Sequence, residues 1–205
     1  PLRRFWAEFR ENKVAVVALV VVALMILLAV FASVVSPQNP YDLANLSLMD
    51  SRRPPGFVGS GGYTHILGTD PQGRDLLSAI FYGLRISIQI GLAAGFVSLT
   101  IGTTLGILAA YVGGRIEALI MRLVDLQLSF PAILLALVIV ALLGQGKAQL
   151  IGALVVAQYA YFARTAYGAA KAERGKDYVE AALAVPLSAR LVVMRHLLPN
   201  CMPPL

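Results

Sequence analysis

Residues 14–35 form an uncharged and almost wholly apolar stretch of 22 residues. A helix rises about 1.5 Å per residue, so a stretch of this length covers a membrane hydrocarbon core of about 30 Å. The apolar part of a secretory signal peptide is only about 7 to 15 residues long, and no small-residue cleavage site is evident before Pro37. We therefore expect a retained first membrane span. The basic and aromatic residues 1–13 ahead of it suit a short amphipathic helix at the membrane surface.

The composition indicates an integral membrane protein. Hydrophobic residues make up 58% of the chain and charged residues 14%, with a mean hydropathy of +0.75, whereas about a quarter of the residues in soluble domains are charged. The net charge of +6 does not indicate a nucleic-acid partner, because the basic residues are scattered at the ends of apolar runs. A single cysteine, Cys201, excludes an internal disulfide framework, and no Cys/His spacing suits a metal ion. We interpret Cys201 as a small apolar filler.

Residues 36–85 are polar, and proline, glycine and asparagine are frequent in the first half of this segment, which predicts a loop without a core of its own. Near its end, Asp70 is placed as a helix N-cap and Pro71 as the first helical residue, and apolar residues then recur at one-sided helical spacing. This pattern predicts a short interfacial helix from Pro71 to Tyr82.

Three further apolar stretches predict three more spans, at residues 86–114, 126–143 and 148–163, the last extended at its cytoplasmic end to Tyr167. The second span contains glycines at a spacing of four. Such small residues let helix backbones approach closely. The two pairs are Gly91 with Gly95, and Gly102 with Gly106.

The connections between these spans carry their own signals. Residues 115–121 are expected to turn the chain, and Pro131 to kink the third span or to start its helix. Arg122 and Asp125 stand three residues apart, a helical spacing that predicts a structural ion pair near the cytoplasmic entry to the third span.

The segment Arg174–Asn200 is the only long polar interruption late in the chain. Asp177 and Glu180 have the spacing of a capping box, which predicts a first short helix that Pro186 ends. A second short helix is expected from residue 187 or 188 to Leu198.

This segment resembles the cytoplasmic coupling loop of ABC importer permeases, whose motif is Glu-Ala-Ala, three residues, Gly, nine residues, Ile, one residue and Leu-Pro. The matching residues are Glu180, Ala181, Ala182, Leu198 and Pro199. Pro186 stands in place of the motif's Gly and is expected to act as the hinge, and His196 stands in place of its Ile. The stretch from His65 to Gly91 also resembles a signature of the peptide and nickel importer branch of these permeases.

The resemblance implies an all-α, polytopic membrane protein: a bundle of transmembrane helices with a cytoplasmic coupling helix, here as a fragment of a six-span permease. Its parts would be an N-terminal segment with the first span, residues 1–35, an outer loop, residues 36–85, and a permease core, residues 86–205. The subunit would be non-catalytic and bind no cofactor or metal. ATP would bind to the partners, which are two cytoplasmic ATPase subunits, beside a second similar permease and a periplasmic or lipid-anchored solute-binding protein.

The resemblance suggests di- or oligopeptides as the solute, with nickel chelates or glutathione as alternatives, and it implies the bacterial inner membrane. The distribution of basic residues agrees with this orientation. Twelve lie on the predicted cytoplasmic side and five outside, which together are the 17 lysines and arginines of the chain and favour a cytoplasmic N-terminus.

Two other classes of membrane protein have less support. A membrane-embedded enzyme needs catalytic groups in one cavity, yet the two histidines, His65 and His196, fall on opposite sides of the membrane, and no nucleophile elbow or zinc motif is present. An ion-coupled secondary transporter usually carries ionisable residues at mid-span, and the four apolar stretches have none.

Overall fold

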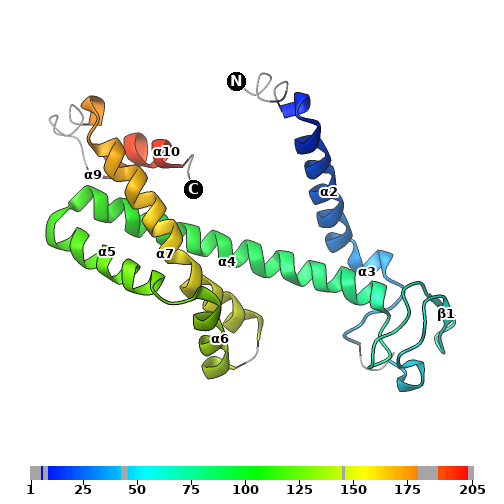
Figure 1. The fold of residues 1–205 in the computed structure, drawn as a ribbon. Coiled ribbons are helices and arrows are strands. Elements are labelled where there is room, and N and C mark those ends of the chain that lie inside the picture. The colour runs from blue at the N-terminus through cyan, green and yellow to red at the C-terminus, as the bar shows by residue number, and fades with distance from the viewer. Residues whose placement is uncertain (1–5, 7–8, 43–45, 145, 180–188, 203–205) are drawn as a thin grey trace. The chain divides into compact units, whose positions relative to one another are not determined.

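The computed structural model describes residues 6, 9–42, 46–144, 146–179 and 189–202 (Figure 1). These residues are almost entirely helices and turns, which confirms the all-α fold class. The chain divides into two compact units, residues 1–89 and 90–205, and helix α4 belongs to both.

The first unit begins with α2, Lys13–Val30, followed by the short helix α3, Ala32–Val35. The side chain of Asn12 caps α2 by accepting hydrogen bonds from the backbone N–H groups of Val14 and Ala15, at 3.1 and 3.2 Å. Helix α2 is long and apolar enough to cross a membrane. The expected first span is therefore present over nearly the predicted residues.

The polar segment between α3 and α4 folds around polar side chains. It contains a 3₁₀ turn, η2 (Leu48–Asp50), and two antiparallel strands, β1 (Phe57–Val58) and β2 (Thr64–His65), with Phe57 opposite His65. The buried polar side chains of this region and of the first turn of α4 are Gln38, Asp50, His65, Thr69, Asp75 and Ser78. Burial of these groups requires hydrogen-bond partners, and those partners give the loop its shape.

Helix α4, Leu76–Val112, contradicts the prediction of a separate interfacial helix from Pro71 to Tyr82. The carboxylate of Asp70 accepts from the N–H groups of Gln72 and Arg74 and so closes a turn. Asp75 caps the helix instead, because its carboxylate accepts from the N–H of Ser78 at 2.7 Å. The interfacial helix and the second span are one continuous helix of 37 residues.

The second unit reverses direction directly after α4. Gly113 and Gly114 have φ values of +74° and +59°, a backbone conformation that glycine adopts without steric cost. Helix α5, Gly114–Leu128, starts there, so residues 115–121 are helical and the predicted turn is confined to the two glycines.

The third predicted span is broken at Pro131. Helix α5 ends at Leu128, and α6, Ala132–Leu143, starts after Pro131 with a bend of 88° between the two. Proline at this position cannot donate to the preceding turn, which agrees with the prediction of a helix start there.

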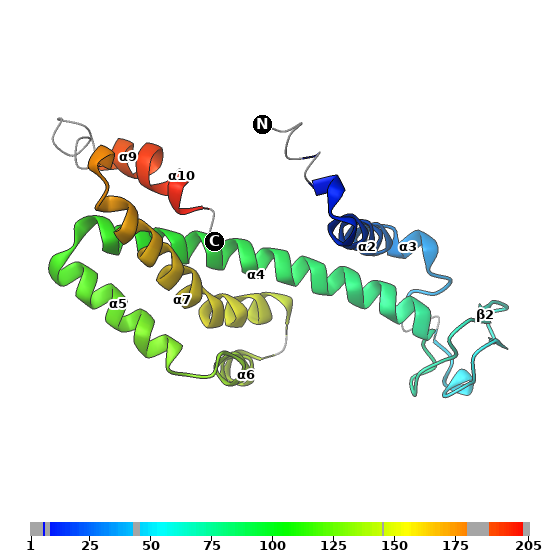
Figure 2. The same ribbon diagram turned by 45° about the horizontal axis from the view of Figure 1, so that its top comes forward.

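Helix α7, Lys147–Arg174, packs against α5 and α6 (Figure 2). It extends beyond the predicted end at Tyr167 because the alanines of its buried face continue to Ala170. By length and composition, α2 and α4 could cross a membrane, and the bent pair α5–α6 passes the same test as one broken span. Helix α7 does not meet that test. The described helices therefore support at most three of the four predicted spans.

The last described segment consists of α9 (Ala189–Val192), the π-helical turn η3 (Val193–Leu197) and α10 (Leu198–Cys201). The helix therefore continues past its predicted end at Leu198. Pro199 lacks an N–H, and its ring would clash with the carbonyl group four residues earlier in a regular α-helix. The wider turn, in which the N–H of Leu198 donates to the carbonyl oxygen of Val193, accommodates the proline without ending the helix.

Candidate functional site

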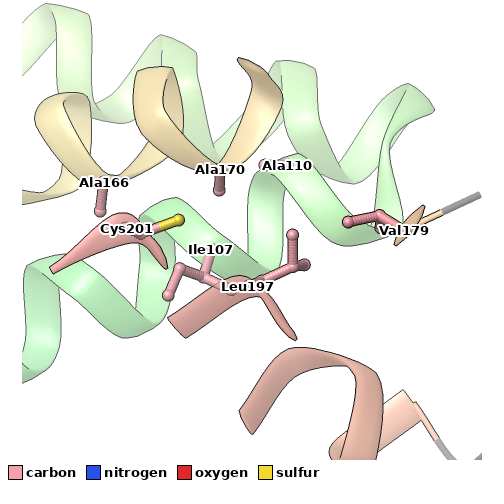
Figure 3. Close-up of a cluster of buried hydrophobic side chains, with 7 residues drawn as sticks. All are labelled: Ile107, Ala110, Ala166, Ala170, Val179, Leu197 and Cys201. Carbon is pink, nitrogen blue, oxygen red and sulfur yellow. The ribbon is translucent and has the colours of Figure 1, made fainter. Parts of the chain in front are cut away.

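The candidate site lies where the two segments that flank residues 180–188 pack against α4 and α7. One end is the segment that follows α7, and the other is η3 and α10. Both ends contribute side chains to a single buried cluster with α4 and α7, which we call the flank cluster (Figure 3). Its members are Ile107, Ala110, Ala166, Ala170, Val179, Leu197 and Cys201.

The flank cluster is tightly closed. Val179, Leu197 and Cys201 have no exposed surface, and neither do the alanines that they contact on α4 and α7. Alanine leaves room for a neighbouring segment to lie close to the helix backbone, so an alanine face suits the docking of both ends of the segment. Burial also raises the pKa of the Cys201 thiol above its ordinary value. The interpretation of Cys201 as an apolar filler agrees with this position.

The predicted site residues are only partly described by the structure. Glu180, Ala181, Ala182 and Pro186 lie outside the described residues, as does the predicted helix break at Pro186. Leu198 is half-buried and packs against the flank cluster, whereas Pro199 is exposed.

Leu197 is the buried anchor of this end and was not among the predicted site residues. The signal was available in the helical spacing of Val193, Leu197 and Cys201, which places these three apolar residues on one face.

Polar contacts join the same two ends. The Nδ2 group of Asn200 donates a hydrogen bond to the hydroxyl oxygen of Tyr178 at 2.9 Å, and the Tyr178 hydroxyl donates to the carboxylate of Glu173. Lys176 also reaches Glu173, with 2.6 Å between Nζ and Oε2. Tyr178 and Lys176 each make a hydrogen bond to Glu173. In both cases this bond is the main cause that raises the pKa of the residue above its ordinary value.

The end of α7 is in turn bound to α4 and α5. The guanidinium group of Arg174 donates to the carbonyl oxygen of Ala110 at 2.7 Å, near the end of α4. On α5, the carboxylate of Glu117 accepts from the hydroxyl of Tyr167 and from Lys171, whose Nζ lies 2.6 Å from Oε1. A displacement of the end of α7 would therefore pull on both neighbouring helices.

The predicted ion pair between Arg122 and Asp125 needs correction. Asp125 pairs with Arg164 of α7, with 2.9 Å between Oδ1 and Nη1, and no ion pair between Arg122 and Asp125 exists among the described residues. Helix α5 contacts α7 through Met121 and Val124, so Asp125 lies at the edge of that contact. An arginine on the opposite helix reaches it there, which the spacing within α5 alone did not indicate.

Comparison with known proteins places this arrangement in a transporter family. Residues 102–205, which include the whole candidate site, match the family described as binding-protein-dependent transport system inner membrane component. Residues 1–55 match the N-terminal TM domain of oligopeptide transport permease C.

Individual relatives are similar along the whole chain. A di/tripeptide transport system permease protein of Pseudomonas aeruginosa is 37% identical over 205 residues, which are 100% of this chain and 67% of the relative. The dipeptide transport system permease protein of Escherichia coli is 38% identical over the same shares. A glutathione transport system permease protein of Pectobacterium atrosepticum is 36% identical over 203 residues, 98% of this chain and 64% of the relative.

The chain thus spans about two thirds of the length of these relatives. The family match covers half of the chain, and the similarity to the individual permeases extends from end to end. These matches show that the protein belongs to the binding-protein-dependent transport system inner membrane components and is a membrane permease subunit of an ABC importer.

Proposed function

We propose that this permease imports di- or oligopeptides across the bacterial inner membrane, and that a loop docks into a cytoplasmic ATPase subunit. The coupling residues of this loop are Glu180, Ala181, Ala182, Pro186, Leu198 and Pro199. One observation carries the docking part of the proposal: Val179, directly before Glu180, and Leu197, directly before Leu198, both pack in the flank cluster on α4 and α7. A segment anchored in this way transmits a push or pull from a partner to the helices behind it. The names of the relatives from Pseudomonas aeruginosa and Escherichia coli support peptides as the solute.

The partners follow from the same proposal. They are a second similar permease, two ATPase subunits that bind and hydrolyse ATP, and a periplasmic or lipid-anchored solute-binding protein. The permease itself performs no chemistry. The proposal assigns this subunit no metal or cofactor of its own.

Glutathione is a second candidate solute because a glutathione permease is similar at 36% identity. Glutathione is itself a small peptide, so both candidates need the same kind of pathway. Uptake of labelled dipeptide and labelled glutathione, measured with the complete set of partner subunits, separates the two.

The docking proposal is tested by Ala182→Leu. A helix that enters a groove of a partner needs small side chains where the backbones come close, and overpacking costs about 1 to 3 kcal/mol, or about 5- to 150-fold in an association constant. We expect normal membrane abundance, with loss of ATPase co-purification and of ATP-dependent uptake. Ala172→Leu, at an exposed position of α7, makes the same chemical change as a control. If both variants co-purified the ATPase at the wild-type level, this result would contradict docking through Ala182.

The role of Pro186 as the hinge is tested separately. Pro186→Gly still ends a helix and should be tolerated, whereas Pro186→Ala lets the first helix continue and should weaken docking. Wild-type uptake and co-purification in the alanine variant would show that the break is set by another residue, such as Ser188.

The energy source distinguishes the importer from an ion-coupled secondary transporter. Uptake into vesicles should require ATP and should persist when the proton gradient is collapsed. Uptake that follows the gradient and ignores ATP would contradict the proposal.

A further inference from the structure

A groove lies between α2 and the first part of α4, wholly within the first unit of the chain. It measures about 170 Å³. On both helices the lining residues are spaced three and four apart, so each helix contributes one face. They are Ile26, Ala29 and Val30 on α2, and Arg85, Ile88 and Gln89 on α4. Because both helices are long and apolar enough to cross a membrane, we expect lipid around this groove.

Arg85 is the charged residue of the groove. Its side chain is half-buried, and within the described part of the chain no ion pair or hydrogen bond holds its guanidinium group. The carboxylates that precede it have partners of their own, Asp70 in Arg74 and Asp75 in His65. An arginine keeps its charge at any physiological pH, and an unpaired charge at the edge of a hydrocarbon core is costly. A ligand with a negative charge removes this cost.

The order of residues along α4 matches the layers of a phospholipid. Arg85 is the last charged residue before the uncharged stretch 86–114, which places it at the outer edge of the predicted second span. Gln89 follows four residues later, about 6 Å deeper along the helix. With a phosphate group at Arg85, the glycerol esters of the lipid lie near the level of Gln89, whose side-chain amide can donate to an ester carbonyl oxygen.

The apolar lining favours a lipid over a free ion. A guanidinium group binds phosphate through two parallel hydrogen bonds, whether the phosphate is free or part of a headgroup. A free ion makes no use of the aliphatic side chains of Ile26, Val30 and Ile88, whereas a lipid places its acyl chains against them. A zwitterionic headgroup brings a second cation close to Arg85, and like charges repel. The site therefore fits a lipid with a net negative headgroup.

We propose that this groove binds an anionic phospholipid of the outer leaflet, with the phosphate group on Arg85 and an ester oxygen on Gln89. The bound lipid fills the space between α2 and α4 and stabilises the arrangement of these two helices. The inference uses residues of the first unit alone and does not depend on the proposed solute or on ATPase docking.

The test measures lipid binding to the permease purified in detergent with its partner subunits. Added phosphatidylglycerol should raise the Tm of the wild type, because a ligand that binds the folded state stabilises it, and native mass spectrometry should detect the bound lipid. Arg85→Gln should weaken this binding about tenfold or more, the change expected from losing a hydrogen bond to a charged group. Arg85→Lys keeps the charge and should lose less. Arg52→Gln, at an exposed position of the outer loop, is the matched control and should bind the lipid as the wild type does.

A second variant separates a lipid from a free ion. Val30→Trp fills the groove and keeps Arg85, so it should weaken phosphatidylglycerol binding, whereas Val17→Trp, at another exposed position of α2, should not. Wild-type affinity in Arg85→Gln or in Val30→Trp would overturn the proposal, as would equal affinity of the wild type for phosphatidylcholine. Displacement of the lipid by inorganic phosphate would identify a site for a free ion instead. Unchanged lipid binding together with loss of the second permease subunit in Arg85→Gln would assign Arg85 to that subunit and also overturn the lipid site.

Discussion

Gly106 of α4 faces Ala166 of α7 so closely that a Cβ atom on residue 106 would lie 2.9 Å from the Cβ of Ala166 and 2.8 Å from the backbone nitrogen of Tyr167. Gly102 has a similar neighbour, Phe162, whose Cβ would lie 2.6 Å away. Gly91 and Gly95, the other pair at the same spacing, have nothing within 4 Å. The close crossing of α4 and α7 therefore depends on one of the two pairs.

Replacing Gly106 with valine should force α4 and α7 apart. Overpacking of this kind costs about 1 to 3 kcal/mol, because the groups in contact include backbone and cannot turn aside. We expect a lower Tm of the purified protein in detergent and lower abundance in the membrane. Gly95→Val adds the same side chain where space is open, and its Tm should stay near the wild-type value. Equal Tm values for the two variants would contradict the close crossing.

The outer loop should lose stability in acid through Asp50. Its carboxylate accepts hydrogen bonds from the Ser60 hydroxyl at 2.6 Å and the Ser60 N–H at 2.9 Å, and these bonds hold its pKa below the ordinary value. A group whose pKa is lower in the folded state stabilises the fold above its unfolded pKa of about 3.9, and this contribution is lost as the pH falls through the folded value.

Pepsin digestion of the loop between about pH 5 and pH 2 measures this loss. Cleavage of the wild-type loop should accelerate below about pH 4, whereas Asp50→Asn should be cleaved readily across the range with little pH dependence of its own. A parallel pH profile for both proteins would show that other groups control the acid response.

Asp75 should be essential for the start of α4. Its carboxylate caps the helix at Ser78 and lies 3.0 Å from Nδ1 of His65, and both side chains are almost fully buried. Asp75→Ala removes the cap and leaves a buried imidazole without its carboxylate, and losses of this kind cost about 2 to 5 kcal/mol. Hydrogen exchange of residues 76–80 should rise strongly. Asp70→Ala removes the turn contacts and the ion pair with Arg74 but no cap of α4. In this variant, exchange of these amides should stay close to wild type.

The predicted topology places residue 45 outside and residue 176 in the cytoplasm. A cysteine introduced as Asn45→Cys should react with a membrane-impermeant maleimide in intact cells, and Lys176→Cys should react only after the cells are opened. The native Cys201 can remain in both variants, because it is fully buried and burial raises its pKa, so little reactive thiolate forms. Labelling of Lys176→Cys in intact cells would contradict the topology.

Local patterns in the sequence were sufficient for several features. The first membrane helix, the helix start after Pro131 and the membrane class follow from runs of apolar residues and from the backbone limits of proline, which act within a few residues. The family could also be inferred, because the spacing from Glu180 to Leu198 and Pro199 is itself a sequence pattern. The start of α4 could not be inferred from the sequence, because Asp70 and Asp75 are both of a residue type that caps helices. Which of them caps α4 depends on partners such as His65 that are distant in the chain.

The tertiary structure alone decided which of several equivalent residues meet. Asp125 pairs with Arg164 on another helix, only the second of the two glycine pairs lies against α7, and Asn200 donates to Tyr178, which is 22 residues earlier in the chain. In each case the sequence offers side chains of the right chemistry but does not state the distance between elements far apart in the chain. That distance is determined by how the alanine faces of α4 and α7 pack, because small side chains let the backbones approach until other atoms come into contact.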